Sequence, residues 1–458
     1  MTTTSPFLSR NFRKLFAAQV TSLAGSGLAT VALALLAYDI AGGSAGLILG
    51  TALAVKMIAY VLIAPVAGAY SERLPRRRLL ITLDIVRAAI VCMLPFVTEV
   101  WQVYILIFGL SACAAVFTPT YQATIPEVLP DDEQYTRALS YSRLAYDLES
   151  LASPAMAAVA LLFLSYDMLF AINGLTFLLS AALVFSTTIS LPQRRDSYGT
   201  IWQELSLGIR FYLATPRLRG LLALSFAVAC GGAMVIVNTV VLVRDALGGS
   251  ETDTAIMLAF YGCGSMIVAL TLPKYLDTGG DRIPMLMGAF LIGVVLCVGA
   301  LSTTFIWFCF VWLLLGAASS LIQTPSGRLL KRSSHQDNRT AVYAAQFALS
   351  HGCWLIAYPL AGWVGSTQGL DAAFVVFAFL AITSCIAAGN LWKVDERVIA
   401  HTHGSMSHSH THVHDEHHEH EHGGWEGPEP HEHQHDHQPI SHEHAYVIDR
   451  HHLGWPDR

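Results

Sequence analysis

Long apolar stretches, separated by short polar connectors, fill the chain between residues 14 and 392. A helix needs about 20 such residues to cross a bilayer. Twelve stretches reach roughly this length, at 14–38, 45–70, 79–97, 101–122, 138–164, 168–190, 218–243, 253–275, 284–301, 305–326, 341–365 and 372–392. Since helices satisfy all their backbone hydrogen bonds internally, the pattern predicts an all-α membrane protein with twelve transmembrane helices.

The first stretch follows Arg10, Arg13 and Lys14, as the apolar core of a signal peptide would. A signal core is only about 7–15 residues long, so we interpret this longer stretch as the first span.

Positive charge lies mainly on one side of the predicted spans. Basic residues occupy the connectors around 10–14, 73–78, 194–217 and 328–339, whereas Arg244 is the only one in the connectors of the other side. Basic connectors stay in the cytoplasm. We therefore expect a multi-pass protein of the cytoplasmic (inner) membrane, with both termini in the cytoplasm.

The longest internal connector, 191–216, separates six predicted spans from six. Within it Ile201, Trp202, Leu205 and Ile209 recur at helical spacing, which predicts an amphipathic helix on the membrane surface. We expect four parts: an N-terminal six-helix half (1–190), a cytoplasmic linker with this helix (191–217), a C-terminal six-helix half (218–393) and a tail (394–458).

The tail differs from the rest of the chain in composition. Eighteen of the 20 histidines lie in it, and 13 Asp and Glu against 4 Lys and Arg follow from Lys393 onward. Neutral imidazole binds divalent transition metals, and nearby carboxylates can complete the shell. The tail has few aliphatic residues, so we expect a disordered, metal-binding arm. Its candidate ligands are His401, His403, His408, His410, His412, His414, His417, His418, His420, His422, His431, His433, His435, His437, His442 and His444.

Several classes of function are disfavoured. The 8 cysteines all fall in predicted spans without a Cys-x-x-Cys pair, which argues against a disulfide framework and a thiolate metal cluster. No Gly-x-x-x-x-Gly-Lys sequence occurs, so we expect the proton gradient, and not ATP, to supply energy. Apart from the tail, the chain has only a small positive balance, which does not suit a nucleic-acid binder. We expect a monomer with no enzymatic activity and no cofactor.

Ionisable residues inside a span are expensive and mark functional positions. Glu149 lies 12 residues beyond Arg137 in the fifth span, and His351 lies 12 residues beyond Arg339 in the eleventh. Both are therefore about 18 Å deep, on equivalent helices of the two halves. We predict that they form the substrate and proton site, with Asp147 on the proton pathway and Gln346 as a neighbouring ligand. A packing role for either residue remains the alternative.

Three more ionisable residues lie in spans. Asp84 and Arg87 are three residues apart and can pair on one helical face, so we favour a structural ion pair. Lys56 lies too deep to reach either surface easily. It either neutralises an acid, such as Asp84 or Glu149, or helps to expel cations electrostatically, and we favour neutralisation.

The connector after the second span, residues 68–78, reads Gly-Ala-Tyr-Ser-Glu-Arg-Leu-Pro-Arg-Arg-Arg. It resembles the signature of the major facilitator superfamily: Gly, three residues, Asp, Arg, one residue, Gly and then basic residues. Glu replaces the Asp, and Pro replaces the second Gly. The resemblance implies two pseudo-symmetric six-helix halves, and a gating latch rather than a substrate site at Gly68, Glu72, Arg73, Arg76, Arg77 and Arg78.

A second resemblance concerns the whole chain. The fourth span, through Ile125-Pro126-Glu127 and the acidic connector to Arg137, resembles the drug- and metal-efflux branches of that superfamily. Twelve such spans with a cytoplasmic histidine-rich tail resemble the nickel-resistance exporters of the NreB type. This implies proton-coupled export of Ni²⁺, with Co²⁺ second, whereas imidazole chemistry alone does not select the metal. Two alternatives stay open: an efflux pump for organic cations or drugs with a metal-buffering tail, and a membrane-anchored metal buffer or sensor.

Overall fold

The structure, a computed structural model, describes residues 5–71, 75–129, 132–188, 201–276, 280–301, 304–334 and 339–392, together with four short segments between 399 and 444. Side chains are described for most of these residues, although not for 64–71 or for the tail.

Each predicted span corresponds to one long helix. They are α1 (Arg10–Ala41), α2 (Ala45–Ser71), α3 (Arg76–Met93), α4 (Val100–Val128), α5 (Asp132–Leu161), α6 (Tyr166–Phe185), α8 (Pro216–Val241), α9 (Glu251–Leu276), α10 (Arg282–Gly299), α11 (Phe305–Arg332), α12 (Arg339–Thr367) and α13 (Leu370–Leu391). Short turns η1 (Pro6–Leu8), η2 (Gly42–Ser44), η3 (Leu94–Phe96) and η4 (Leu242–Ala246) flank some of them. The prediction of an all-α, twelve-helix fold is confirmed.

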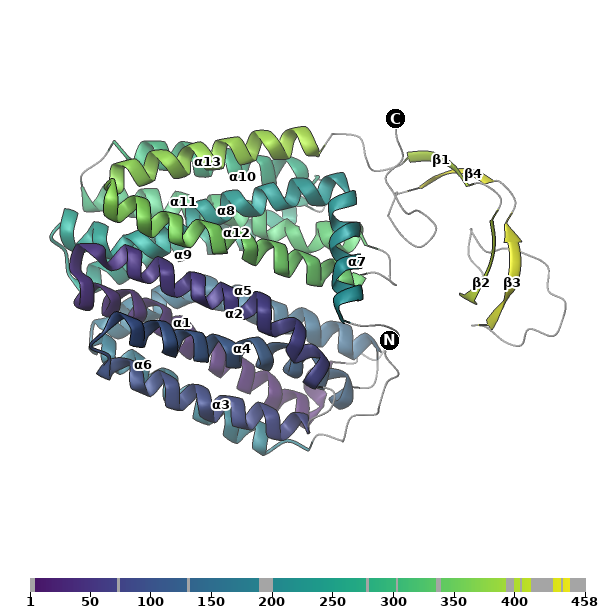
Figure 1. The fold of residues 1–458 in the computed structure, drawn as a ribbon, viewed down its shortest axis with the longest axis horizontal. Helices are drawn as coiled ribbons and strands as arrows, with labels where there is room; N and C mark the ends of the chain where they lie inside the picture. Colours follow the sequence, from purple (N-terminus) through teal and green to yellow (C-terminus); the bar gives the residue numbers. More distant parts are fainter. Residues whose placement is uncertain are drawn as a thin grey trace.

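The helices form two groups that lie side by side (Figure 1). Helices α1 to α6 make the N-terminal half and α8 to α13 the C-terminal half, and the groups meet mainly where α2 packs on α12 and α5 packs on α9. Within the described residues, nine stretches are long and apolar enough to cross a membrane, and one of these joins α1 and α2. The protein is therefore a multi-pass membrane protein.

One end of the bundle carries most of the basic side chains, and we call it the basic end. Here the side chains of Lys14 and Arg77 donate to the carbonyl oxygens of Ser186 and Phe185, at the end of α6. In the C-terminal half Arg282 donates to the carbonyl oxygens of Trp392 at 2.7 Å and Gly389 at 3.2 Å, at the end of α13. The last carbonyls of a helix lack partners within it, and positive charge is favourable there. In both halves, basic side chains of neighbouring helices thus bond the last carbonyl groups of the sixth helix.

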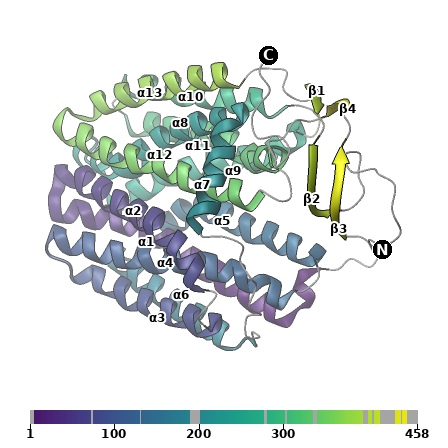
Figure 2. The same ribbon diagram turned by 45° about the vertical axis from the view of Figure 1, so that its right-hand side comes forward.

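Helix α7 (Ile201–Ala214) begins the part of the linker that the structure describes. It lies across the ends of the other helices (Figures 1 and 2). A Cβ on Gly208 would lie 2.2 Å from the carbonyl oxygen of Ala341, so α7 packs closely on α12. Tyr212 is fully buried in this contact. The helix predicted in the linker is present, and its apolar face covers a neighbouring helix.

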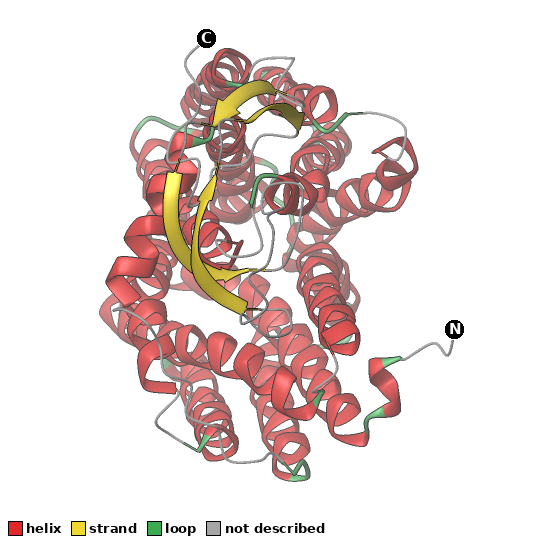
Figure 3. Cartoon of the chain, turned by 90° about the vertical axis from the view of Figure 1, so that its right-hand side faces the viewer, coloured by secondary structure: helices red, strands yellow, loops and turns green. Residues whose placement is uncertain are grey.

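The described parts of the tail are extended. Strand β1 (Ile399–His403) pairs with β4 (Ile440–His444), and β2 (Met406–His412) pairs with β3 (His431–His437), both antiparallel. All four lie at the basic end (Figure 3). We expected a disordered arm, and the structure differs at these segments. Histidine at every second position suits an extended chain, in which alternate residues share a face.

At the end opposite the basic end, polar contacts join the two halves. The hydroxyl of Tyr38 on α1 donates to Asp245 of η4, and the guanidinium of Arg244 lies 5.1 Å from the Tyr38 ring. Nearby, Tyr166 donates to Asp39 within the N-terminal half. No pattern in the sequence pointed to this cluster, because Tyr38 and Asp245 are 207 residues apart.

Two glycines allow α2 and α12 to touch near the same end. A Cβ on Gly50 would lie 2.5 Å from the carbonyl oxygen of Tyr358, and one on Gly362 would lie 2.3 Å from that of Gly46. Small residues let membrane helices pack backbone to backbone, which replaces the hydrophobic driving force that is absent in lipid. This backbone contact joins the two halves near the end opposite the basic end.

Alanine at either glycine should therefore separate the two halves. We expect Gly50→Ala and Gly362→Ala each to destabilise the fold by about 1–3 kcal/mol, the usual cost of overpacking. Gly352→Ala, on the same helix α12, is the matched control, because a Cβ there meets nothing within 4 Å. Thermal unfolding of the purified proteins in detergent measures the difference. Equal melting temperatures for all three variants would contradict this account of the interface.

Candidate functional site

Three helices from both halves carry the ionisable side chains of the candidate site. Lys56 and Tyr60 lie one turn apart on α2, Glu149 lies on α5, and His351 lies on α12. Residues four apart share a helical face, so Lys56 and Tyr60 face the same neighbours. All four side chains are half-buried, so none is fully enclosed by packing.

Glu149 is held against α1. The hydroxyl of Ser153 donates to Oε1 of Glu149 at 3.2 Å. A Cβ on Gly27 would lie 2.9 Å from the same oxygen and 1.8 Å from the Ser153 hydroxyl, so only glycine fits there. This is its one side-chain partner among the described residues, and it leaves most of the hydrogen-bonding capacity of the carboxylate unused. Glu149 can therefore accept a proton or a cation.

His351 is fixed in one orientation. Its Nδ1 lies 2.7 Å from the carbonyl oxygen of Phe347, and because a carbonyl only accepts, Nδ1 must carry the proton. The imidazole also lies against two aromatic rings, with centroids 3.9 Å away for Phe347 and 5.6 Å away for Tyr60. The neutral ring then keeps its lone pair on Nε2, the arrangement found in most histidine metal ligands.

Lys56 has no ion pair and no hydrogen bond with any residue that the structure describes. Asp84 is paired with Arg87. Of the two acids considered for Lys56, Glu149 is therefore the one without a basic partner among the described residues.

The predicted site residues are not assembled into a metal cluster. No contact joins Glu149 to His351, and the described side chains contain no group of three His, Cys, Asp or Glu placed to hold a metal. The side chain of Asp147 and those of the tail histidines lie outside the described part of the chain.

Gln346 has other partners than the predicted ones. The hydroxyl of Tyr212 on α7 donates to its Oε1, and its Nε2 lies 3.4 Å from the hydroxyl of Ser225. Both ends of the amide are thus engaged. In this structure Gln346 connects the linker helix to α12.

Asp84 and Arg87 form an ion pair on α3 that is enclosed by the N-terminal half. The hydroxyl of Ser180 donates to Asp84 at 2.7 Å. The guanidinium lies 4.1 Å from the centroid of the Phe117 ring and 4.5 Å from that of Phe177. Both charges are therefore compensated inside the protein, as a structural pair requires.

The predicted gating connector is described in part. Glu72 and Arg73 lie outside the described residues, and so does the surrounding of Gly68, which is in α2. Arg76 pairs with Glu127 at the end of α4, and Arg77 stacks on the Phe185 ring at 4.9 Å. Arg78 is exposed. The contacts described here for Arg76 and Arg77 lie within the N-terminal half.

The C-terminal half has a related ion pair of opposite polarity. Asp281 precedes α10, and Arg328 of α11 donates to it at 2.7 Å, with Arg332 at 3.1 Å. In the N-terminal half the base lies at the start of the third helix (α3) and the acid near the end of the fourth (α4). In the C-terminal half the acid lies just before the third helix (α10) and the bases near the end of the fourth (α11). Both pairs connect the same two helices of each half.

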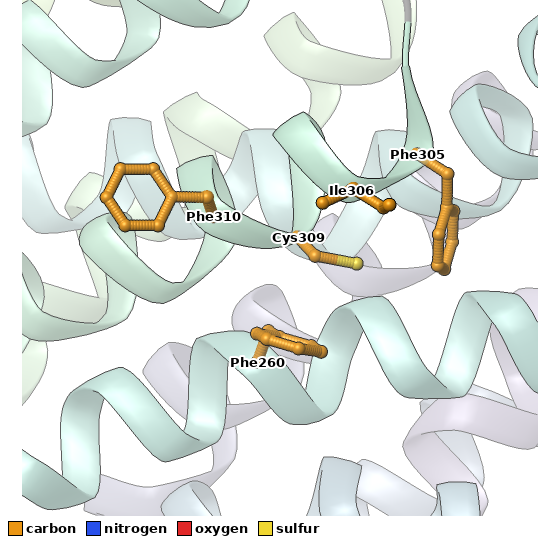
Figure 4. A pocket seen from close by; sticks show the side chains of 5 residues that line it. All are labelled: Phe260, Phe305, Ile306, Cys309 and Phe310. Atoms are coloured by element: carbon orange, nitrogen blue, oxygen red, sulfur yellow. The ribbon is translucent and has the colours of Figure 1, made fainter.

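A pocket of about 260 Å³ lies between α9 and α11. Its lining is apolar, and Figure 4 shows the rings of Phe260, Phe305 and Phe310 around Ile306 and Cys309. Without a charged or hydrogen-bonding side chain, it has no means of binding an ion. We therefore separate it from the candidate site.

The Arg76–Glu127 pair makes the stability of the folded protein depend on pH. Burial raises the pKa of the Glu127 carboxyl, and Arg76 opposes this effect only partly. At pH values between the ordinary and the raised pKa, the folded state holds a proton that the unfolded state has released. The stability that Glu127 contributes therefore falls as the pH rises through this range. Relative to Glu127→Gln, the wild type should lose about 1 kcal/mol between pH 5 and pH 8.

Arg76→Gln is the complementary variant, because it leaves the carboxylate unpaired. It should destabilise more than Glu127→Gln at pH 8, and the two variants should differ less at pH 5, because more of Glu127 is protonated at the lower pH. Chemical unfolding of the purified proteins at both pH values tests this. A wild type that gains stability over Glu127→Gln as pH rises would show that the ion pair outweighs burial.

Comparison with known proteins agrees with this architecture. The family model described as Major Facilitator Superfamily matches residues 15–278 and 221–411. Among solved structures, the bacterial homolog of the human lysosomal transporter Spinster, in an inward-facing and unoccupied conformation, has a TM-score of 0.68 at 13% identity, over 84% of this chain and 96% of that one. The nucleoside transporter NupG has a TM-score of 0.66 at 13% identity, over 84% of this chain and 100% of that one. These likenesses concern the fold alone.

Sequence relatives are also transporters. The uncharacterized MFS-type transporter YfiS of Bacillus subtilis is 24% identical over 70% of this chain and 79% of its own length. Macrolide efflux protein A of Streptococcus pyogenes is 28% identical over 32% of this chain and 37% of its own length. The family model spans both halves, and the helix order is the one that the superfamily signature at residues 68–78 implied. The chain belongs to the major facilitator superfamily of transporters.

Proposed function

We propose that this transporter exports divalent metal ions, Ni²⁺ first and Co²⁺ second, in exchange for protons across the cytoplasmic membrane. Its basic end would face the cytoplasm. The observation that carries the proposal is that each half contributes one candidate ligand: a neutral imidazole held in one orientation, His351, and a carboxylate with a single described hydrogen-bond partner, Glu149. Nε2 of His351 and the oxygens of Glu149 are ligand types that these ions accept.

Exchange follows from the chemistry of the two groups. Both must be deprotonated to bind a metal ion, so protons and metal compete for them. Protons that enter from outside would neutralise Glu149 and occupy Nε2 of His351. The ion would then lose both ligands at once and leave. Two protein ligands suit this task, since a complete protein shell would hold the ion too tightly for release.

The tail supports the choice of a metal as cargo. Its histidine-rich strands lie at the basic end, where α7 and the start of α1 also lie (Figures 1 and 3). An arm of this composition would raise the ion concentration at the side from which the cargo is loaded. Imidazole must be deprotonated to bind a metal ion, so the arm would release metal as the pH falls.

A second candidate is efflux of amphiphilic organic cations. The rings of Tyr60 and Phe347, 6.3 Å apart, lie beside His351, and such rings attract cations. Macrolide efflux protein A is among the relatives, although over a third of this chain. This candidate makes the tail a metal buffer, and it predicts transport that does not depend on His351 as a ligand.

Transport in inside-out vesicles tests the site. We expect Glu149→Gln to abolish proton-driven Ni²⁺ and Co²⁺ accumulation, because the variant removes the charge at nearly constant volume. His351→Ala should be similarly impaired, and the double variant little worse than either, since the two groups act together. Glu99→Gln is the matched control: it makes the same chemical change in the same half, at an exposed position before α4, and should transport normally.

Two results would change the proposal. Wild-type transport of metal by Glu149→Gln, with normal pH dependence, would remove Glu149 from the site. Proton-driven transport of tetraphenylphosphonium, with no transport of any metal among Ni, Co, Zn and Cu, would favour the organic-cation candidate.

The tail is tested by truncation after Arg397. The full-length protein should bind several more divalent ions than the truncated one, and the difference should vanish below about pH 6, where imidazole becomes protonated. Metal tolerance of cells should weaken without disappearing, because the arm gathers ions and does not move them. If truncation removed all tolerance and Glu149→Gln removed none, the protein would be a membrane-anchored metal buffer.

A further inference from the structure

We propose that Tyr60 is the third cargo contact of the site, with its ring holding the imidazole of His351 and its hydroxyl bonding a water molecule of the hydrated ion. The inference rests on the proposed function, and it concerns a residue that the sequence did not single out. Tyrosines are common in helical membrane proteins, so only the tertiary arrangement distinguishes this one.

The ring of Tyr60 connects the two halves at the depth of the site. Its centroid lies 5.6 Å from that of the His351 imidazole, with the planes tilted by 49°. Phe347 lies 3.9 Å from the imidazole. His351 thus has two aromatic neighbours, one on its own helix and one on α2. Together with the Nδ1 hydrogen bond, they limit the directions in which Nε2 can point.

The hydroxyl of Tyr60 has no hydrogen-bond partner among the residues that the structure describes. Other tyrosine hydroxyls of the bundle do have one, such as those of Tyr38, Tyr166 and Tyr212. A polar group in a membrane span normally finds a partner, because leaving it unsatisfied is costly. Tyr60 is half-buried, so a ligand or water can reach it.

Tyr60 also shares a helical face with Lys56, one turn away on α2, so its ring and the ammonium group face the same neighbouring helices. Tyr60 thus contacts His351 of the C-terminal half and lies one turn from Lys56, which has no partner among the described residues.

The chemistry of the cargo fits a neutral phenol. Glu149 and His351 would leave several coordination positions of Ni²⁺ or Co²⁺ to water. Water bound to a cation is a good hydrogen-bond donor, and a phenol oxygen accepts such a bond without adding charge. The contact would increase affinity modestly and would break when the ion leaves.

Two substitutions separate the ring from the hydroxyl. Tyr60→Phe keeps the ring and removes the hydroxyl, so we expect KM for Ni²⁺ to rise about tenfold, the effect of one lost hydrogen bond, with kcat nearly unchanged. Tyr60→Leu also removes the support of His351. It should lower kcat as well, because the imidazole no longer meets the ion in a fixed orientation.

Tyr358→Phe is the matched control. Tyr358 lies two turns further along α12, stacks on Trp354 at 4.9 Å, and has no hydrogen-bond partner for its hydroxyl among the described residues. The same loss of an oxygen atom there should leave KM and kcat unchanged. Rates of Ni²⁺ uptake into inside-out vesicles, measured over a range of concentrations, give both constants for every variant.

The outcomes distinguish this inference from the proposed function. If Tyr60→Phe had the wild-type KM while Glu149→Gln stayed inactive, the metal site would stand and Tyr60 would not be part of it. If Tyr60→Leu behaved like Tyr60→Phe, the ring would have no positioning role. If the wild-type protein moved no metal ion, the proposed function and this inference would both fall.

Discussion

The architecture depends on one constraint: inside a bilayer, every backbone polar group needs a partner from the protein itself. Long helices satisfy that demand everywhere except at their last turns. At the basic end, lysine and arginine side chains of neighbouring helices supply the missing donors. Lys14 and Arg77 donate to the end of α6, and Arg282 donates to the end of α13. The residues that set the charge asymmetry of the chain therefore also fasten neighbouring helices to one another. The same solution appears in both halves, on equivalent helices.

The same constraint separates two kinds of charged residue within the spans. Asp84 and Arg87 satisfy each other, with Ser180 and two aromatic rings completing their surroundings. Lys56 and Glu149 are also inside the bundle, but no ion pair joins them. Unpaired charges are costly in a membrane, and a protein retains them when a ligand or a proton uses them. This contrast supports the proposed site more than any single residue does.

The position of the site explains why it spans both halves. Lys56, Tyr60 and Glu149 belong to the N-terminal half, and His351 belongs to the C-terminal half. Nearer the opposite end, Gly50 and Gly362 bring α2 and α12 into backbone contact, and Tyr38 and Asp245 close the same side. Any motion of one half against the other would therefore move His351 relative to Glu149. Binding and conformational change would be coupled through the same helix pair.

The sequence by itself determined the twelve helices, their order and the superfamily, because apolar length and connector charge are local properties of the chain. It also indicated Glu149, Lys56 and His351 as unusual, since ionisable residues are rare in spans. The three-dimensional structure decided what surrounds them. Gln346 accepts a hydrogen bond from Tyr212, and Tyr60 contacts His351 from a helix almost 300 residues away in the chain. Such contacts depend on how the two halves pack, and helical periodicity does not encode the register between distant helices.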